Sequence, residues 1–354
     1  MTDLDKQFNQ AVESQKESLA KEIVDRQYAR RKEVWENFGN EGYRKSVRDT
    51  KYHLDYLSKA VAGRSPSLFK DYIAWVRVLF DRLEFSPDVL STTLDITREV
   101  LKENLDRELF NLAETYLNTA EPELSSGPET PASLLSPDLP LADLAREYLD
   151  RLLAGERDQA SRIILQAAED GVPVKEIYLD VFQRTQHEVG RLWQVNEISV
   201  AHEHYCTAAT QLIMAQLYPR IMSTAKIDRR MVMTCVNDEL HELGARMVAD
   251  FFEMEGWDTY YLGANTPTAD ILTTLEERDP DLLGVSTTIT YHLDKLSSLI
   301  QAVKSSSIGK TIPILVGGRP FNIDPELWEK VGADGQASNA DAALHTVEEL
   351  INNR

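Results

Sequence analysis

The chain has 354 residues, enough for two or three domains, and with 42% apolar and 27% charged residues it has the composition of a folded protein. Its formal net charge of −20 argues against direct binding to nucleic acid or anionic membranes. Apolar runs stay short of membrane-spanning length, the polar start does not resemble a signal peptide, and 2 cysteines are too few for a disulfide framework, so we expect a cytoplasmic protein.

Helical patterns fill the first third of the chain, and we interpret residues 1–118 as an N-terminal helical module. Its dense aromatic residues are most simply core, and a chromophore pocket is the alternative. A segment rich in Pro, Ser, Glu and Thr follows and predicts a linker over residues 119–140. The predicted helices of the module are residues 3–38, a second helix that ends at Gly63, residues 67–83, and a fourth from Pro87 to about Leu117.

Residues 141–225 predict a four-helix bundle, because helical patterns are joined there by short polar turns. Ser199 is a good N-cap for the fourth helix, which leaves Glu203 and His204 in its first turns. The chain reversal brings Trp193, at the end of the third helix, near them. A buried tryptophan beside capping charges is the plain interpretation. The predicted helices are about 141–153, 158–170, 175–193 and 200–221.

Residues 226–354 predict an α/β domain with a doubly wound sheet of five parallel strands. Buried, β-prone runs end in a polar loop, a glycine turn, hydroxyl residues and paired glycines. In such a sheet the ligand lies at the carboxyl ends of the strands. The strands that the sequence indicates most clearly are 231–236, 258–262, 282–288 and 312–318.

The loop after the first strand holds a candidate metal ligand. A neutral His241 could donate the lone pair of one ring nitrogen to a metal. Glu239 could accept a hydrogen bond from the N–H of the other ring nitrogen and so fix the tautomer. Taken alone, a loop histidine is more often a polar residue without a ligand, and that alternative stays open at this point.

The motifs at the strand ends resemble the cobalamin-binding domain of the methionine synthase and corrinoid protein family. The family's D-x-H-x-x-G motif corresponds to Glu239–Gly244, with Glu in place of the frequent Asp. The serine strand corresponds to Gly284–Thr290, the glycine pair corresponds to Gly317-Gly318, and the resemblance covers about residues 229–354. It implies that His241 replaces the cofactor's own base under cobalt. A doubly wound domain with another ligand, or with none, is the alternative.

By this resemblance, the displaced nucleotide tail of the cofactor would lie between the serine strand and the glycine pair. The cofactor-binding residues that it implies are Glu239, Leu240, His241, Gly244, Ser286, Thr288, Thr290, Gly317 and Gly318.

The bundle motif resembles the adenosylcobalamin light-sensing proteins, in which a Trp precedes a Glu-His pair by nine intervening residues. The resemblance implies that Trp193 and Glu203 line an adenosyl pocket, with His204 close by. Light-driven cleavage of the cobalt–carbon bond would then change the conformation of the protein, and an unidentified downstream signalling protein would bind in response to that change. Gln194 stands where DNA-binding members of that family carry a histidine, so the upper ligand after photolysis is left open.

The N-terminal helical module differs from the winged helix of the DNA-binding sensors and looks more like that of the photocobilins, which pair cobalamin with a bilin. The expected cofactors are therefore adenosylcobalamin and, as a second chromophore, biliverdin. The main prediction is a light-responsive sensor without enzymatic activity, with a homo-oligomer left open. The first alternative is a corrinoid methyl carrier of a methyltransferase system. A binding scaffold without photochemistry is the second.

Overall fold

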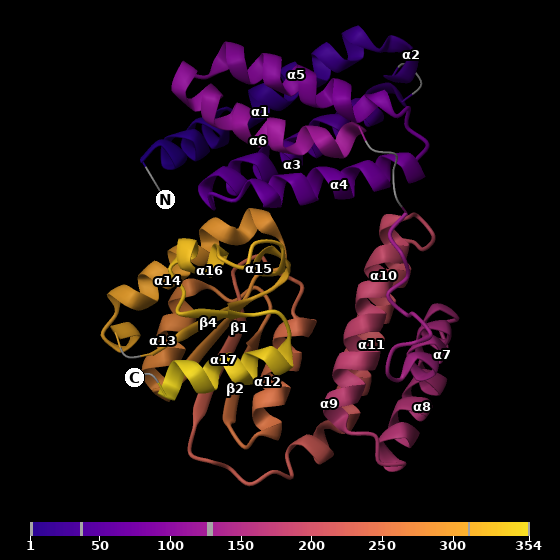
Figure 1. Ribbon diagram of the computed structural model, residues 1–354, viewed down its shortest axis with the longest axis vertical. Coiled ribbons are helices and arrows are strands. Elements are labelled where there is room, and N and C mark those ends of the chain that lie inside the picture. Colours follow the sequence, from indigo (N-terminus) through magenta and orange to yellow (C-terminus); the bar gives the residue numbers. More distant parts are fainter. Residues whose placement is uncertain (1–2, 36–37, 126–129, 311, 353–354) are drawn as a thin grey trace. The chain divides into compact units, whose positions relative to one another are not determined.

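The structure, a computed structural model, forms two compact units, one helical and one built around a parallel sheet (Figure 1). It describes residues 3–35, 38–125, 130–310 and 312–352. The first unit consists of residues 1–128, 289–297 and 319–331. The second unit consists of residues 129–288, 298–318 and 332–354.

The first unit contains a group of N-terminal helices whose apolar faces pack on one another. On the longest of them, Phe8, Val12, Leu19 and Ile23 recur at helical spacing and are all buried. The N-terminal helices are α1 (Asp3–Arg30), α2 (Lys32–Trp35), α3 (Gly39–Ala62), α4 (Pro66–Arg82), α5 (Asp88–Asn104) and α6 (Arg107–Ser125).

The helix boundaries differ from the sequence prediction in two places. The predicted helix over residues 3–38 is interrupted at Arg31, and the helix α3 begins at Gly39, which has φ +56°. The predicted fourth helix is two helices, because Leu105 takes an extended conformation with φ −112° and ψ 152°. Residues 36–37 of the predicted first helix lie outside the described residues.

The predicted linker over residues 119–140 is ordered at both of its ends. Helix α6 continues to Ser125, and residues 126–129 lie outside the described ranges. Further along, Ser133 Oγ and Leu134 N donate hydrogen bonds of 3.0 and 2.8 Å to the Glu188 carboxylate in the bundle. The division into residues 1–118, 119–140, 141–225 and 226–354 stays a prediction.

The second unit begins with the predicted helical bundle, whose helices follow the predicted boundaries within a few residues. Its third helix contains a π-helical stretch, which buries Tyr178 and Phe182. The bundle consists of α7 (Ala142–Leu153), α8 (Arg157–Glu169), α9 (Val174–Glu176), the π-helical η2 (Ile177–Gln183), α10 (Arg184–Gln194) and α11 (Val200–Ile221).

The sheet of the second unit has five parallel strands in the order β2-β1-β3-β4-β5, which confirms the predicted fold class. The order reverses direction between β1 and β3, and their carboxyl ends form the topological switch point at which such sheets bind ligands. Cys235, Ser286, Gly317 and Ala337 are register partners across neighbouring strands at this edge. The strands are β1 (Arg230–Cys235), β2 (Asp258–Gly263), β3 (Leu282–Ser286), β4 (Ile314–Gly317) and β5 (Gly335–Ala337).

Further helices connect the strands or follow the last one. They are α12 (Leu243–Met254), α13 (Thr268–Arg278), α14 (Leu293–Ser305), α15 (Arg319–Ile323), α16 (Leu327–Val331) and α17 (Ala340–Asn352), with the short turns η3 (Thr290–His292) and η4 (Ile308–Lys310).

Helix α12 is buried on two sides and joins the bundle to the sheet. Ala245, Ala249 and Phe252 pack in the sheet core. Met247 and Phe251 belong instead to the core of the bundle. The bundle therefore packs on the helix that directly follows the loop of His241.

A buried carboxyl group lies in this interface. Asp250 Oδ2 accepts a hydrogen bond of 2.8 Å from the Tyr178 hydroxyl and lies 4.0 Å from Arg246 Nε. Burial is the main cause that raises the pKa of Asp250 to about 6. The folded protein therefore holds a proton on Asp250 more tightly than the unfolded chain does. The contribution of this group to stability is complete below its ordinary pKa of 3.8 and is lost as the pH rises through about 6.

Replacing Asp250 by Asn should raise the free energy of unfolding at pH 7 by about 1–3 kcal/mol, because the amide retains an acceptor for Tyr178 without a buried charge. The gain should shrink to near zero below about pH 4, where the wild-type carboxyl group is itself neutral. Urea unfolding at both pH values measures the difference. A gain of equal size at both pH values, or none at pH 7, would contradict the assignment.

Candidate functional site

The loop between β1 and α12 carries the predicted metal ligand, and a neighbouring loop holds it in place. Asp238 turns the chain in a left-handed conformation with φ +66°. Its backbone N–H donates to Asn265 Oδ1 at 2.7 Å, and the Asn265 N–H donates to the Glu239 carbonyl at 3.0 Å. The loop after β2 thus fixes the backbone from which the side chains of Glu239 and His241 project.

Glu239 joins the ends of β1 and β3. Its side chain is fully buried, and its Oε1 accepts hydrogen bonds from His241 N at 3.0 Å and from His241 Nδ1 at 2.6 Å. Its Oε2 accepts a hydrogen bond of 2.8 Å from the backbone N–H of Thr288. The longer Glu side chain therefore reaches the imidazole, although the family motif often has Asp at this position.

His241 is oriented so that one ring nitrogen is available for a ligand. Its side chain is 56% exposed, and Nδ1 is bound to Glu239, which leaves Nε2 as the nitrogen that can bind a metal. The hydrogen bond to Glu239 is the largest cause that raises the pKa of His241 above its usual value. The charges of Glu239 and Glu203 raise it further, against the effect of burial.

The ends of β3 and β4 supply the other predicted residues. Ser286 and Gly317 are register partners, and Ser286 and Thr290 are buried. Between the predicted residues Ser286 and Thr288, Thr287 Oγ1 is buried and has no hydrogen-bond partner among the described residues. A buried hydroxyl without a partner at a ligand-binding edge is a polar atom that a bound group can satisfy.

Two of the predicted glycines, Gly318 and Gly244, differ in what a side chain at their position would meet. Gly318 has φ +116°, and a Cβ there would lie 2.0 Å from the Thr287 carbonyl oxygen, so the chain itself requires glycine at this position. A Cβ on Gly244 would meet no atom within 4 Å among the described residues, so open space lies beside the first turn of α12. Leu240, next to His241, is 72% exposed.

These residues fit a cobalamin. A corrin macrocycle brings its own ring nitrogens to cobalt, so one anchored imidazole suffices as a protein ligand. His241 is such a group, with its tautomer fixed by the buried Glu239. The unsatisfied Thr287 hydroxyl and the open space at Gly244 are consistent with a ligand at this edge.

The residues predicted for the upper face lie around the turn from α10 to α11. Trp193 is half-buried near the end of α10. Ser199 caps α11 as predicted, with His202 completing the capping box. Glu203 accepts from Thr207 Oγ1 at 3.2 Å, and its Oε2 lies 2.5 Å from Nδ1 of His204, whose side chain is 75% exposed.

One link between the bundle and the candidate site was not predicted from the sequence. Glu242, next to His241, accepts a hydrogen bond of 2.7 Å from Gln211 Nε2 of α11. Its other oxygen accepts bonds from the Tyr261 hydroxyl at 3.2 Å and the Ala264 N–H at 3.0 Å. Glu242 occupies a variable position of the motif, and no local signal in the sequence pairs it with Gln211.

Comparison with known families and proteins shows that this chain is similar to cobalamin-binding proteins. Residues 229–345 match a model described as a B12 binding domain, and residues 144–218 match a second model with that description. Dimethylamine corrinoid protein 3 of Methanosarcina acetivorans is 22% identical over 210 residues, which cover 59% of this chain and 97% of the relative. The dimethylamine corrinoid protein of Methanosarcina barkeri is 24% identical over 213 residues, which cover 59% and 98%.

A solved structure agrees with the fold. The monomethylamine corrinoid protein of Methanosarcina barkeri matches with a TM-score of 0.54 at 18% identity, over 59% of this chain and 99% of that chain. The corrinoid relatives favour the predicted alternative, a corrinoid carrier, over the light-sensing interpretation. Within the described ranges, no helix is long and apolar enough to cross a membrane.

Replacing Glu239 by Gln should weaken cobalamin binding about 10- to 100-fold, because an amide has only one acceptor oxygen, whereas the two carboxylate oxygens now accept from His241 N, His241 Nδ1 and Thr288 N. Absorbance titration with aquocobalamin measures the affinity. Asp238→Asn is the matched control, since it neutralises the neighbouring acid on the same loop and should bind as wild type does. Equal affinities for Glu239→Gln and wild type would contradict the role of Glu239.

Proposed function

We propose that the chain binds cobalamin with His241 as the lower ligand of cobalt and carries a methyl group for a partner methyltransferase. The observation that carries this proposal is the bridge made by Glu239, which binds His241 Nδ1 with one oxygen and the Thr288 N–H with the other. The bridge fixes the imidazole and the end of the serine strand in one arrangement. The nucleotide tail would lie near Ser286, Thr288, Thr290, Gly317 and Gly318, with Leu240 and Gly244 beside the corrin.

The methyl-carrier function is supported by the names of the relatives, which are dimethylamine corrinoid proteins. When bound, the cofactor would supply a cobalt–carbon bond, either a methyl bond made and broken in group transfer or an adenosyl bond that light can break. His241 would bind the metal through Nε2, and Glu239 would hold the proton on Nδ1. The chain would carry the group, and its partner would catalyse the transfer.

A light-responsive sensor is the second candidate, and one observation favours it. Trp193 and Glu203 flank the turn between α10 and α11. A pocket lined by Trp193, Glu203 and His204 would suit the adenosyl group of adenosylcobalamin, whereas a methyl group needs no such space.

A bilin such as biliverdin would belong to the sensor candidate as a second chromophore. The cysteines do not favour covalent attachment, since Cys206 and Cys235 are both buried. Burial raises the pKa of Cys206 to about 11 and raises that of Cys235 further, so both thiols stay protonated at neutral pH. A bilin would therefore be held by non-covalent contacts.

Replacing Trp193 by Ala should separate the two candidates. If the chain is a methyl carrier, Trp193→Ala should change the affinities for methylcobalamin and adenosylcobalamin by similar factors. A loss of about tenfold or more for adenosylcobalamin alone would support the sensor. Under either function, Glu203→Ala should change the two affinities in the same direction as Trp193→Ala does. Absorbance titration in the dark measures the affinity of each variant for methylcobalamin and for adenosylcobalamin.

Spectra of the wild-type protein provide the control for this comparison. Under the methyl-carrier function, added biliverdin should keep its free spectrum, and illumination of the adenosylcobalamin complex should leave the protein conformation unchanged. A biliverdin shift, or a light-induced change in size-exclusion profile, would contradict the methyl-carrier assignment.

A further inference from the structure

The segments that leave two of the proposed cofactor-binding strands are bound by the N-terminal helices. Residues 289–297 directly follow Thr288, and residues 319–331 directly follow Gly318. Both segments belong to the same compact unit as α1–α6. The N-terminal helices therefore hold the chain immediately beyond two positions proposed to contact the nucleotide tail.

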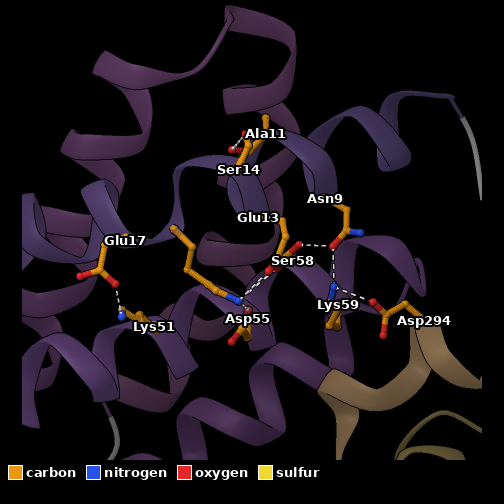
Figure 2. A network of polar contacts seen from close by, with 11 residues as sticks. Asn9, Ala11, Glu13, Ser14, Glu17, Lys51, Asp55, Ser58, Lys59 and Asp294 are labelled. Atoms are coloured by element: carbon orange, nitrogen blue, oxygen red, sulfur yellow. Dashed lines mark hydrogen bonds and ion pairs between the residues drawn. The ribbon is translucent and has the colours of Figure 1, made fainter. Parts of the chain in front are cut away.

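The first segment is held by a buried lysine. Lys59 of α3 has a side chain that is only 8% exposed, and its Nζ donates to Asp294 Oδ2 at 2.9 Å and to Asn9 Oδ1 at 2.9 Å. Ser58 Oγ donates to the same Asn9 oxygen at 2.6 Å. Figure 2 shows Lys59 between Asn9 and Asp294. A buried ammonium group that loses its partner is strongly destabilising, so Lys59 constrains the position of Asp294.

Aromatic contacts hold the same segment a few residues earlier. The ring of Tyr291 lies 5.8 Å from that of Tyr56 in an edge-on arrangement, and 6.3 Å from that of Tyr52 in a stacked one, measured between centroids. Tyr291 is three residues after Thr288, whose N–H is bound by Glu239. The segment is thus anchored to the N-terminal helices through Tyr291, and it directly follows Thr288, whose N–H is bound to Glu239.

The second segment has polar anchors of its own. Arg319, the residue after Gly318, donates from Nη2 to both carboxylate oxygens of Asp71 at 2.9 Å. Lys330 Nζ donates to the Arg64 carbonyl at 3.3 Å. The N-terminal helices α3 and α4 and the residues next to them therefore contact both segments.

We propose that the N-terminal helices make the site selective for corrinoids that carry a complete nucleotide tail. The inference rests on the proposed cobalamin site, in which the tail is the part of the cofactor that meets Ser286, Thr288 and Gly317-Gly318. Fixing the segments beyond these residues keeps the ends of β3 and β4 in the conformation that receives the tail. Loss of the anchors removes that preorganisation, whereas the hydrogen bond between Glu239 and His241 Nδ1 involves neither segment and is retained.

The test compares aquocobalamin with diaquocobinamide, a corrinoid without the nucleotide tail, on the full chain. Lys59→Met keeps the apolar stem of the side chain and removes its charge, while the partly exposed Asp294 can turn to water. We expect Lys59→Met to bind aquocobalamin about tenfold more weakly than wild type, with the affinity for diaquocobinamide changed by less than about twofold. Absorbance titration measures both.

Lys16→Met is the matched control. Lys16 Nζ lies 2.8 Å from Asp55 Oδ1, and this ion pair joins α1 to α3 without involving either segment. It should leave both affinities as in wild type. Tyr291→Ala removes the aromatic anchor and keeps Lys59, so it should reproduce the selective loss. If circular dichroism shows that Lys59→Met does not fold, the affinities of Tyr291→Ala test the inference in its place.

The inference would be overturned if the variants lost affinity for both corrinoids by the same factor. It would also be overturned if both Lys59→Met and Tyr291→Ala bound aquocobalamin as tightly as wild type. In either case the proposal that the chain binds cobalamin would still stand. A wild-type protein that binds neither corrinoid would overturn the proposed function, and the inference with it. The two failures are distinguishable because the second appears before any residue is changed.

Discussion

The candidate site depends on one buried carboxylate. Glu239 has no exposed surface, and its two oxygens bind three donors, two on His241 and one on Thr288. A buried carboxylate is stable only when such donors satisfy it. The loop after β1 and the end of β3 therefore cannot move apart without leaving that charge unpaired. The arrangement at the switch point of the sheet, with Nε2 of His241 available for a metal, follows from this constraint.

Helix α12 extends the constraint to the bundle. Its sheet-facing residues and its bundle-facing residues are both buried, so the bundle is packed on the helix that begins just after His241. The hydrogen bond from Gln211 to Glu242 adds a polar contact between α11 and the residue beside His241. A conformational change in the bundle would thus reach the loop of His241 through a short series of packed groups.

The sequence predicted the parts of this protein that depend on local pattern. The parallel strands, the bundle helices, the Ser199 cap and the pairing of Glu239 with His241 all follow from spacing within short segments. Contacts between residues far apart in sequence, such as Lys59 with Asp294 and Gln211 with Glu242, could not be predicted, because nothing local specifies the partner of a polar side chain. Gly318 illustrates a second limit. The family resemblance implied that it binds the cofactor, yet contact with the Thr287 backbone alone already requires glycine there.

The central claim, that His241 is the lower ligand of cobalt, can be tested without any mutation. Protein grown with ¹⁵N-labelled histidine is loaded with unlabelled cobalamin and reduced to the paramagnetic cob(II)alamin state, and its electron paramagnetic resonance spectrum is recorded. Ligation by His241 predicts that the nitrogen superhyperfine pattern changes from triplets to doublets, because ¹⁵N has half the nuclear spin of ¹⁴N. Triplets that persist in the labelled protein would show that the cofactor keeps its own base on cobalt, and would contradict the account.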